Sequence, residues 1–383
     1  FPRSARAATP PAPLGTVRLR RWIVAGSLAA LATTPQARSL AKAVLVLSEV
    51  LPSPARPFPA ITRDPVVTRI QLLLGPADLY EPKKGTAPGI VLVHGANPGG
   101  IDDPRVRRMA SAFARAHRSV LAPALTLAQR RLDRDDTARI RKAIRYLADR
   151  TDRPVVVVAF SYGAAYTLVA LEQEPGLQRS VAALATIGTY FDLAHLIEGV
   201  TTGQVCIDGV YHEWRPPEGA REQAALILST FLSEPDRESF LLAYRIRNSQ
   251  GLSDEALAMY HLLINQDPRR TPELVDRLSM PLRDLFFELS PAQRIERIRI
   301  PVYALHSRVD PAAPPVESSE LVKAVGRRAP ARLTVVGSLR HVTPIGTIAG
   351  RLRDGPALVA LAAAILRIQE PWLPATASRP NRA

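Results

Sequence analysis

The chain has 383 residues, of which 46% are hydrophobic, so it is long enough for one large or two ordinary globular domains and is neither disordered nor fibrous. The formal net charge is +15, but the arginines are scattered among acidic residues without a basic stripe, which argues against a nucleic-acid-binding protein. A single cysteine, Cys206, excludes an intrachain disulfide and a cysteine-based metal site.

The first 60 residues are basic and apolar. Residues 18–34 have an arginine-rich flank before an apolar run too short to span a bilayer, and a second apolar run covers 43–51. This pattern is typical of a secretory signal or of a helical hairpin on a membrane surface, and it is also compatible with two helices packed on the domain. Residues 18–51 therefore predict a membrane-associated or exported protein, with a cytoplasmic protein as the alternative. The proline-rich stretch 52–59 reads as a linker.

From residue 61 onward, strand-like and helix-like stretches alternate. The wholly apolar runs at 89–93 and 155–160 are typical of strands buried on both faces of a parallel sheet. The stretch 134–149 has apolar residues at helical spacing and acidic residues in its first turn. The alternation predicts an α/β fold whose mostly parallel, doubly wound sheet is covered by helices on both faces.

The alternation is interrupted once. Residues 190–297 contain several helix-like stretches and no convincing strand, and strand–helix alternation then resumes. The sequence therefore predicts a core formed by 61–189 and 298–371, a helical cap inserted at 190–297, and a tail at 372–383. Since loops at the carboxyl ends of parallel strands surround the site in such sheets, we expect the cap to act as a lid and to shape an apolar pocket.

A candidate nucleophile, Ser161, lies between the apolar run 155–160 and a helix-like stretch. Ala159 and Gly163 lie two residues before and after it, and small residues there allow the sharp turn of the G-x-S-x-G pattern, here A-x-S-x-G. The alternative is a serine that merely caps the following helix.

A glycine-rich loop follows the run 89–93 and could supply an oxyanion hole. It reads His94-Gly95-Ala96-Asn97, and glycine allows the backbone to approach a substrate closely. We expect the amide groups of Ala96 and Tyr162 to be the donors. His94, Gly95 and Asn97 would support the loop, with the His94 side chain bracing it rather than acting as the base.

A nucleophilic serine needs a base and an orienting acid, and both follow later strands. Asp310 comes after the apolar stretch 300–305, and His341 comes after 333–336. The chain order Ser161, Asp310, His341 is the order in which nucleophile, acid and base occur in folds that carry the G-x-S-x-G turn. Asp192 also follows a strand and is the alternative acid.

These segments resemble the α/β-hydrolase superfamily from about residue 66 to residue 368. The resemblance is carried by HGANPGG, AFSYGAA, HSRVDP and SLRH, and the layout around them is most similar to the dienelactone-hydrolase-like and acyl-esterase branches. Dienelactone hydrolases use a cysteine nucleophile, so Ser161 favours a general carboxylic-ester hydrolase. The resemblance implies Ser161 as nucleophile, His341 as base and Asp310 as its orienter, without a cofactor.

The predicted function is hydrolysis of a carboxylic ester, thioester or amide, from a small molecule or a lipid, through an acyl-enzyme on Ser161. An acyltransferase using the same triad and a non-catalytic binding protein on the same fold are the alternatives. No histidine or acidic cluster in the sequence has metal-ligand spacing, and no phosphate-binding glycine motif is present, so neither a metal nor a nucleotide cofactor is expected.

Overall fold

The computed structural model describes residues 34–51, 57–83, 87–129, 131–345 and 348–368. The basic segment before residue 34, most of the proposed linker and the tail 372–383 lie outside these residues, so the predictions made for them have no structural counterpart here.

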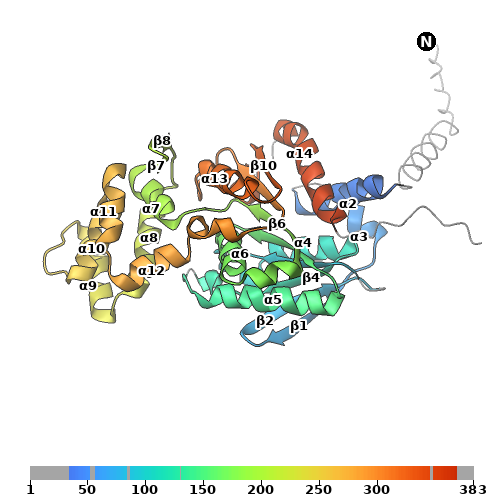
Figure 1. The fold of residues 1–383 in the computed structure, drawn as a ribbon, viewed down its shortest axis with the longest axis horizontal. Coiled ribbons are helices and arrows are strands. Elements are labelled where there is room, and N and C mark those ends of the chain that lie inside the picture. Colours follow the sequence, from blue (N-terminus) through green and yellow to red (C-terminus); the bar gives the residue numbers. More distant parts are fainter. Residues whose placement is uncertain (1–33, 52–56, 84–86, 130, 346–347, 369–383) are drawn as a thin grey trace, which may run out of the picture.

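An eight-stranded sheet forms the centre of the molecule and confirms the predicted fold class (Figure 1). Its strand order is β1-β2-β4-β3-β5-β6-β9-β10, antiparallel from β1 to β4 and parallel from β4 to β10. The strands are β1 (Val66–Leu72), β2 (Gly75–Glu81), β3 (Gly89–Val93), β4 (Ser119–Pro123), β5 (Val155–Phe160), β6 (Val181–Ile187), β9 (Val302–Ser307) and β10 (Ala331–Val336). The central position of β3 and β5 explains why these runs contain only apolar residues.

Helices cover both faces of the sheet, and alternate residues of each strand contact opposite layers. Val91 and Val93 of β3 belong to the core shared with α5 (Asp135–Thr151), α6 (Tyr162–Gln173) and α13 (Pro315–Gly326). Ile90 and Leu92 belong to the core shared with α2 (Pro35–Val50), α4 (Pro104–Arg115) and α14 (Ile348–Arg367). A short helix, α3 (Pro57–Ile61), joins α2 to the sheet.

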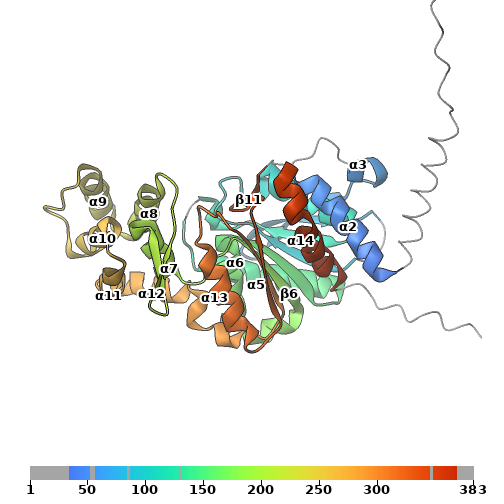
Figure 2. The same cartoon turned by 90° about the horizontal axis from the view of Figure 1, so that it is seen from above.

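The apolar run at 43–51 lies on the domain as part of α2. Ala43 and Val46 are buried in the core, and α2 packs along α14 and α4 (Figure 2). The Thr34 side chain starts the helix by accepting a hydrogen bond from the Ala37 amide at 3.2 Å. Within the described residues, no helix combines the length and apolar character needed to cross a bilayer.

Most of the segment 190–297 forms a lobe that projects from one end of the sheet (Figures 1 and 2), whereas residues 291–297 return to pack against α6 and α13. Its helices are α7 (Leu193–Thr202), α8 (Ala220–Leu228), α9 (Glu234–Ile246), α10 (Asp254–Ile264), α11 (Thr271–Asp276) and α12 (Met280–Glu288). The prediction that this segment lacks strands was wrong, because β7 (Gln204–Ile207) and β8 (Val210–Glu213) form a hairpin. Asp208 and Gly209 turn it with positive φ at both residues, and an Asp-Gly pair is a strong hairpin signal.

Candidate active site

Ser161 occupies a strained turn between the end of β5 and the start of α6. Its φ of 51° and ψ of −129° are unusual for a residue other than glycine. The Ser161 amide donates a hydrogen bond to the Ile187 carbonyl of β6 at 2.8 Å, which ties the turn to the neighbouring strand. Ser161 occupies the N-cap position of α6, but its side chain makes no capping hydrogen bond to that helix.

Two glycines leave the space that this turn needs. A Cβ atom on Gly163 would lie 2.1 Å from the His94 carbonyl oxygen, and one on Gly95 would lie 2.9 Å from the Ser161 Cβ. Neither position could carry a side chain without moving the backbone. Ala159, at the position usually occupied by the first glycine, is fully buried in the core, so its methyl group is accommodated.

The loop after β3 is held by the two polar side chains expected to support it. His94 is buried; its Nδ1 lies 2.8 Å from the Gly95 carbonyl, and its Nε2 accepts a hydrogen bond from the Leu125 amide at 3.3 Å. These partners favour the tautomer with the proton on Nδ1. Burial lowers the pKa of His94, which keeps the ring neutral. The side-chain amide of Asn97 donates a hydrogen bond from Nδ2 to the Asp103 carboxylate at 2.6 Å, which links the two ends of the loop.

The two backbone amides expected to form an oxyanion hole are those of Ala96 and Tyr162. Among the described residues, neither the Ala96 nor the Tyr162 amide has a hydrogen-bond acceptor. Tyr162 is the first residue of α6, so the positive end of the helix dipole adds to the attraction of its amide for negative charge.

The structure brings Asp310 and His341 into direct contact. Asp310 follows β9, and His341 lies in the turn between β11 (Leu339–Arg340) and β12 (Thr343–Pro344). The Nδ1 atom of His341 lies 2.9 Å from each carboxylate oxygen of Asp310, so Nδ1 donates and Nε2 is left without a proton in the neutral ring. His341 also has a positive φ, of 55°.

The Asp310 carboxylate is held ionised by its surroundings. Burial alone would raise the pKa of Asp310, but hydrogen bonds from His306 and His341 outweigh it and hold the pKa well below its usual value. The amides of Ala312 and Ala313 donate to the same carboxylate at 2.8 and 3.0 Å.

Sequence reasoning missed three residues that support this pair. His306 is fully buried, and its Nε2 lies 3.3 Å from Asp310 Oδ2. Gly188 has a φ of 63°, and a Cβ atom there would lie 3.0 Å from the His341 ring. Trp214 donates its indole N–H to the Asp310 carbonyl at 2.7 Å from the inserted lobe. The contact of Trp214 with Asp310 joins segments that are distant in the sequence, so no local pattern predicts it. A glycine directly after β6, such as Gly188, does indicate a tight turn.

Asp192, the alternative acid, lies in a different environment. Its carboxylate caps α7 by accepting from the Ala194 amide at 2.8 Å, and it also accepts from Ser290 and Gln293. Among the described residues, no histidine contacts it within hydrogen-bond distance. The structure therefore pairs His341 with Asp310 and not with Asp192.

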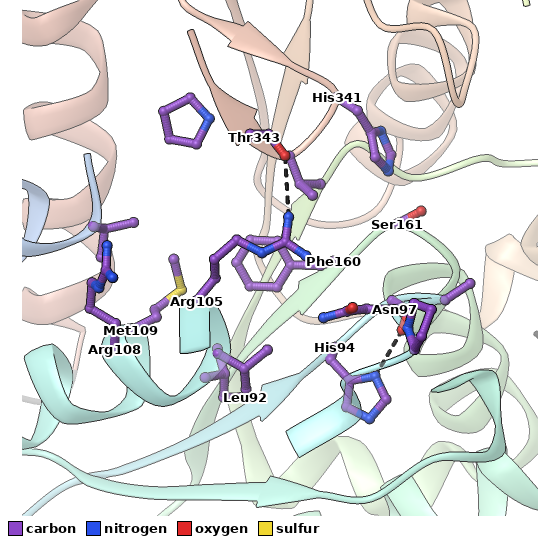
Figure 3. A pocket seen from close by; sticks show the side chains of 17 residues that line it. Leu92, His94, Asn97, Arg105, Arg108, Met109, Phe160, Ser161, His341 and Thr343 are labelled. Atoms are coloured by element: carbon purple, nitrogen blue, oxygen red, sulfur yellow. Dashed lines mark hydrogen bonds between the residues drawn. The ribbon is translucent and has the colours of Figure 1, made fainter. Parts of the chain in front are cut away.

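A pocket of about 310 Å³ opens over Ser161 and His341 (Figure 3). Ser161 Oγ makes no hydrogen bond to His341 among the described residues, but both side chains lie at the same end of the pocket. The pocket is lined by Val50, Leu92, His94, Gly95, Ala96, Asn97, Pro98, Arg105, Val106, Arg108, Met109, Phe160, Ser161, His341, Val342, Thr343 and Pro344.

The expectation that the insertion shapes this pocket was wrong. None of the lining residues comes from 190–297, because that lobe projects from the end of the sheet. The pocket wall is formed instead by the end of α2, by α4 and by the segment after His341. Among the described residues, no group of three histidine, cysteine or acidic side chains lies close enough together to hold a metal ion.

The sequence of residues 90–349 matches the model of the "Alpha/beta hydrolase family". No curated protein matches the chain in sequence.

Several solved structures match the chain at low sequence identity. The acylaminoacyl peptidase of Pyrococcus horikoshii shares 16% identity over 81% of this chain and 43% of its own, with a TM-score of 0.47, so the present chain spans less than half of that protein. A thermostable carboxylesterase cloned from a metagenomic library shares 17% sequence identity over 89% of this chain and 99% of its own length, with a TM-score of 0.43. The dienelactone hydrolase of Anabaena variabilis shares 14% sequence identity over 78% of this chain and 96% of its own length, with a TM-score of 0.42.

The substitution Gly163→Ala tests the packing of the turn. The new methyl group would overlap the His94 carbonyl, and we expect it to lower the free energy of unfolding by about 3 kcal/mol or more. Gly355→Ala is the matched control, because a Cβ atom there meets nothing within 4 Å. Denaturant unfolding of both variants measures the difference, and equal stability of the two would contradict this description of the turn.

Proposed function

The chain belongs to the alpha/beta hydrolase family, and from this premise we propose that it is a serine hydrolase that cleaves a carboxylic ester through an acyl-enzyme on Ser161. The observation that carries the proposal is the contact of His341 Nδ1 with the Asp310 carboxylate at the end of the pocket that also holds Ser161.

The proposed reaction begins with attack of Ser161 Oγ on the acyl carbonyl. The proton passes to His341 Nε2, because Nδ1 is engaged by Asp310. Asp310 holds the ring in this tautomer and stabilises the imidazolium that forms. The protonated ring then donates to the leaving group, and a water molecule deprotonated by His341 resolves the acyl-enzyme.

The negative charge that develops on the carbonyl oxygen would be bound by the amides of Ala96 and Tyr162. Both have no competing acceptor among the described residues, so they are available without rearrangement. Loss of one such donor typically costs about 10²–10³ in rate. The neutral His94 would keep Ala96 in place through its two backbone contacts rather than exchange protons with the substrate.

The pocket favours a substrate with an apolar part. Its wall includes Val50, Leu92, Val106, Met109 and Phe160, which suit an acyl chain of a small-molecule or lipid ester. Thioesters and amides use the same mechanism, and transfer of the acyl group to an acceptor other than water would use the same triad.

The triad is tested by substitution and by labelling with a fluorophosphonate. Ser161→Ala should abolish labelling and lower kcat for p-nitrophenyl esters by roughly 10⁶. Asp310→Asn should lower kcat by roughly 10³–10⁴-fold, because the His341 ring is then no longer held with its proton on Nδ1 and has no negative charge beside it. Asp192→Asn is the matched control and should retain the activity.

Two outcomes would contradict the triad. Failure of the unmodified protein to be labelled and to turn over any ester would overturn the hydrolase proposal. Full activity of Asp310→Asn together with loss in Asp192→Asn would assign the acid to the other carboxylate.

Val50 tests whether α2 forms part of the acyl site. Val50→Trp should fill space at the pocket wall and lower kcat/KM for p-nitrophenyl octanoate relative to the acetate by about tenfold, since exclusion of two methylenes costs about 0.8 kcal/mol each. Val44 lies on the same helix and is half exposed, so Val44→Trp is the control. An unchanged chain-length profile in Val50→Trp would show that α2 does not limit the acyl chain.

A further inference from the structure

Two arginines line the pocket over Ser161, and only one of them is paired with a carboxylate. Arg105 and Arg108 both line it from α4, one helical turn apart, and no acidic residue is among the described residues that line it. The two arginines differ in what they contact.

Arg105 is neutralised by a neighbouring carboxylate. Its Nε and Nη2 donate to the two oxygens of Asp103 at 3.0 and 2.8 Å, and its Nη1 lies 3.4 Å from Thr343 Oγ1. This bidentate contact holds the pKa of Asp103 well below its usual value. Arg105 is thus engaged in fixing the loop after β3 to the segment after His341.

Arg108 has no such partner. Among the described residues it forms no hydrogen bond and no ion pair, although it is partly buried. The adjacent Arg107 faces outward and pairs with Asp102. The one acidic residue of α2, Glu49, forms no ion pair with Arg108. A guanidinium with five donors therefore faces the pocket without an acceptor from the described protein.

Arg108 lies toward the end of the pocket opposite Ser161 and His341 (Figure 3). Figure 3 shows Ser161 and His341 at one end of the pocket and Arg108 with Met109 at the other, with Phe160 and the Asp103-paired Arg105 between them. A molecule that reaches both ends would place its ester at Ser161, an apolar segment along Phe160, and its far end beside the guanidinium.

We propose that Arg108 binds an anionic group, a carboxylate or a phosphate, at the end of the substrate opposite the scissile carbonyl. Guanidinium binds both groups in a planar, bidentate manner, and the partly buried, apolar surroundings strengthen the contact. The substrate class would be esters whose apolar chain ends in an acidic group. This inference rests on the proposed function, because it assumes that the ester is cleaved at Ser161.

The test uses pairs of p-nitrophenyl esters on the full chain. In each pair, one acyl chain ends in a carboxylate or phosphonate and the other ends in the neutral carboxamide or dimethyl phosphonate, over several chain lengths, and release of p-nitrophenol is the readout. We expect kcat/KM to be higher for the anionic member, and the ratio to fall roughly tenfold in Arg108→Gln. The ratio compares two substrates on one protein, so a partly misfolded preparation does not change it.

Arg107→Gln is the matched control for charge. It removes the same charge from the same helix at a residue that does not line the pocket, and we expect it to leave the ratio unchanged. A preference for either anion that depends on Arg108 supports the proposal, and the larger of the two preferences identifies the group. An equal loss in both variants, or no preference in the unmodified protein, would overturn it.

The two proposals fail in different ways. If neither member of any pair is hydrolysed and Ser161 is not labelled by a fluorophosphonate, the hydrolase proposal fails. If the neutral members release p-nitrophenol but the ratio does not depend on Arg108, only the anion site fails.

Discussion

The backbone of Ser161 holds a positive φ that would cost about 1–3 kcal/mol in an unconstrained chain. It persists because the surrounding structure determines it: the Ser161 amide is bound by β6, and Gly163 and Gly95 leave room where a side chain would meet backbone. The same turn begins α6, so a single backbone conformation sets the positions of the proposed nucleophile and of one proposed amide donor. The position of the loop after β3, and with it the Ala96 amide, follows from how closely that loop packs on Gly163.

The two sides of the site are built by different parts of the chain. Trp214 reaches the Asp310 backbone from the inserted lobe, whereas α2 and α4 form the wall of the pocket. The lobe therefore contacts the proposed acid, and the helices at the amino-terminal part of the chain form the wall against which we propose the substrate binds. In the proposed mechanism, the residues that orient His341 would thus come from other segments than the residues that contact the substrate.

Much of this arrangement could be predicted from the sequence, because local patterns determine it. The apolar runs predict buried parallel strands, and residues that follow such strands converge at one edge of a sheet, as Ser161, Asp310 and His341 do. The pocket wall could not be predicted, since the apolar residues at 43–51 fit a membrane surface as well as a groove between α4 and α14. His306 and Gly188 act through contacts between distant segments, and the sequence holds no periodic signal for such contacts.

The central claim is that Ser161 attacks a carbonyl whose oxygen is bound by the Ala96 and Tyr162 amides. A crystal structure of the protein after reaction with an alkyl fluorophosphonate tests it most directly, because the tetrahedral phosphorus stands in for the attacked carbon. The account predicts a covalent bond to Ser161 Oγ, one phosphoryl oxygen within about 3 Å of both amides, and the alkyl chain against α4. A phosphonate attached to another residue, or a phosphoryl oxygen turned away from both amides, would contradict it.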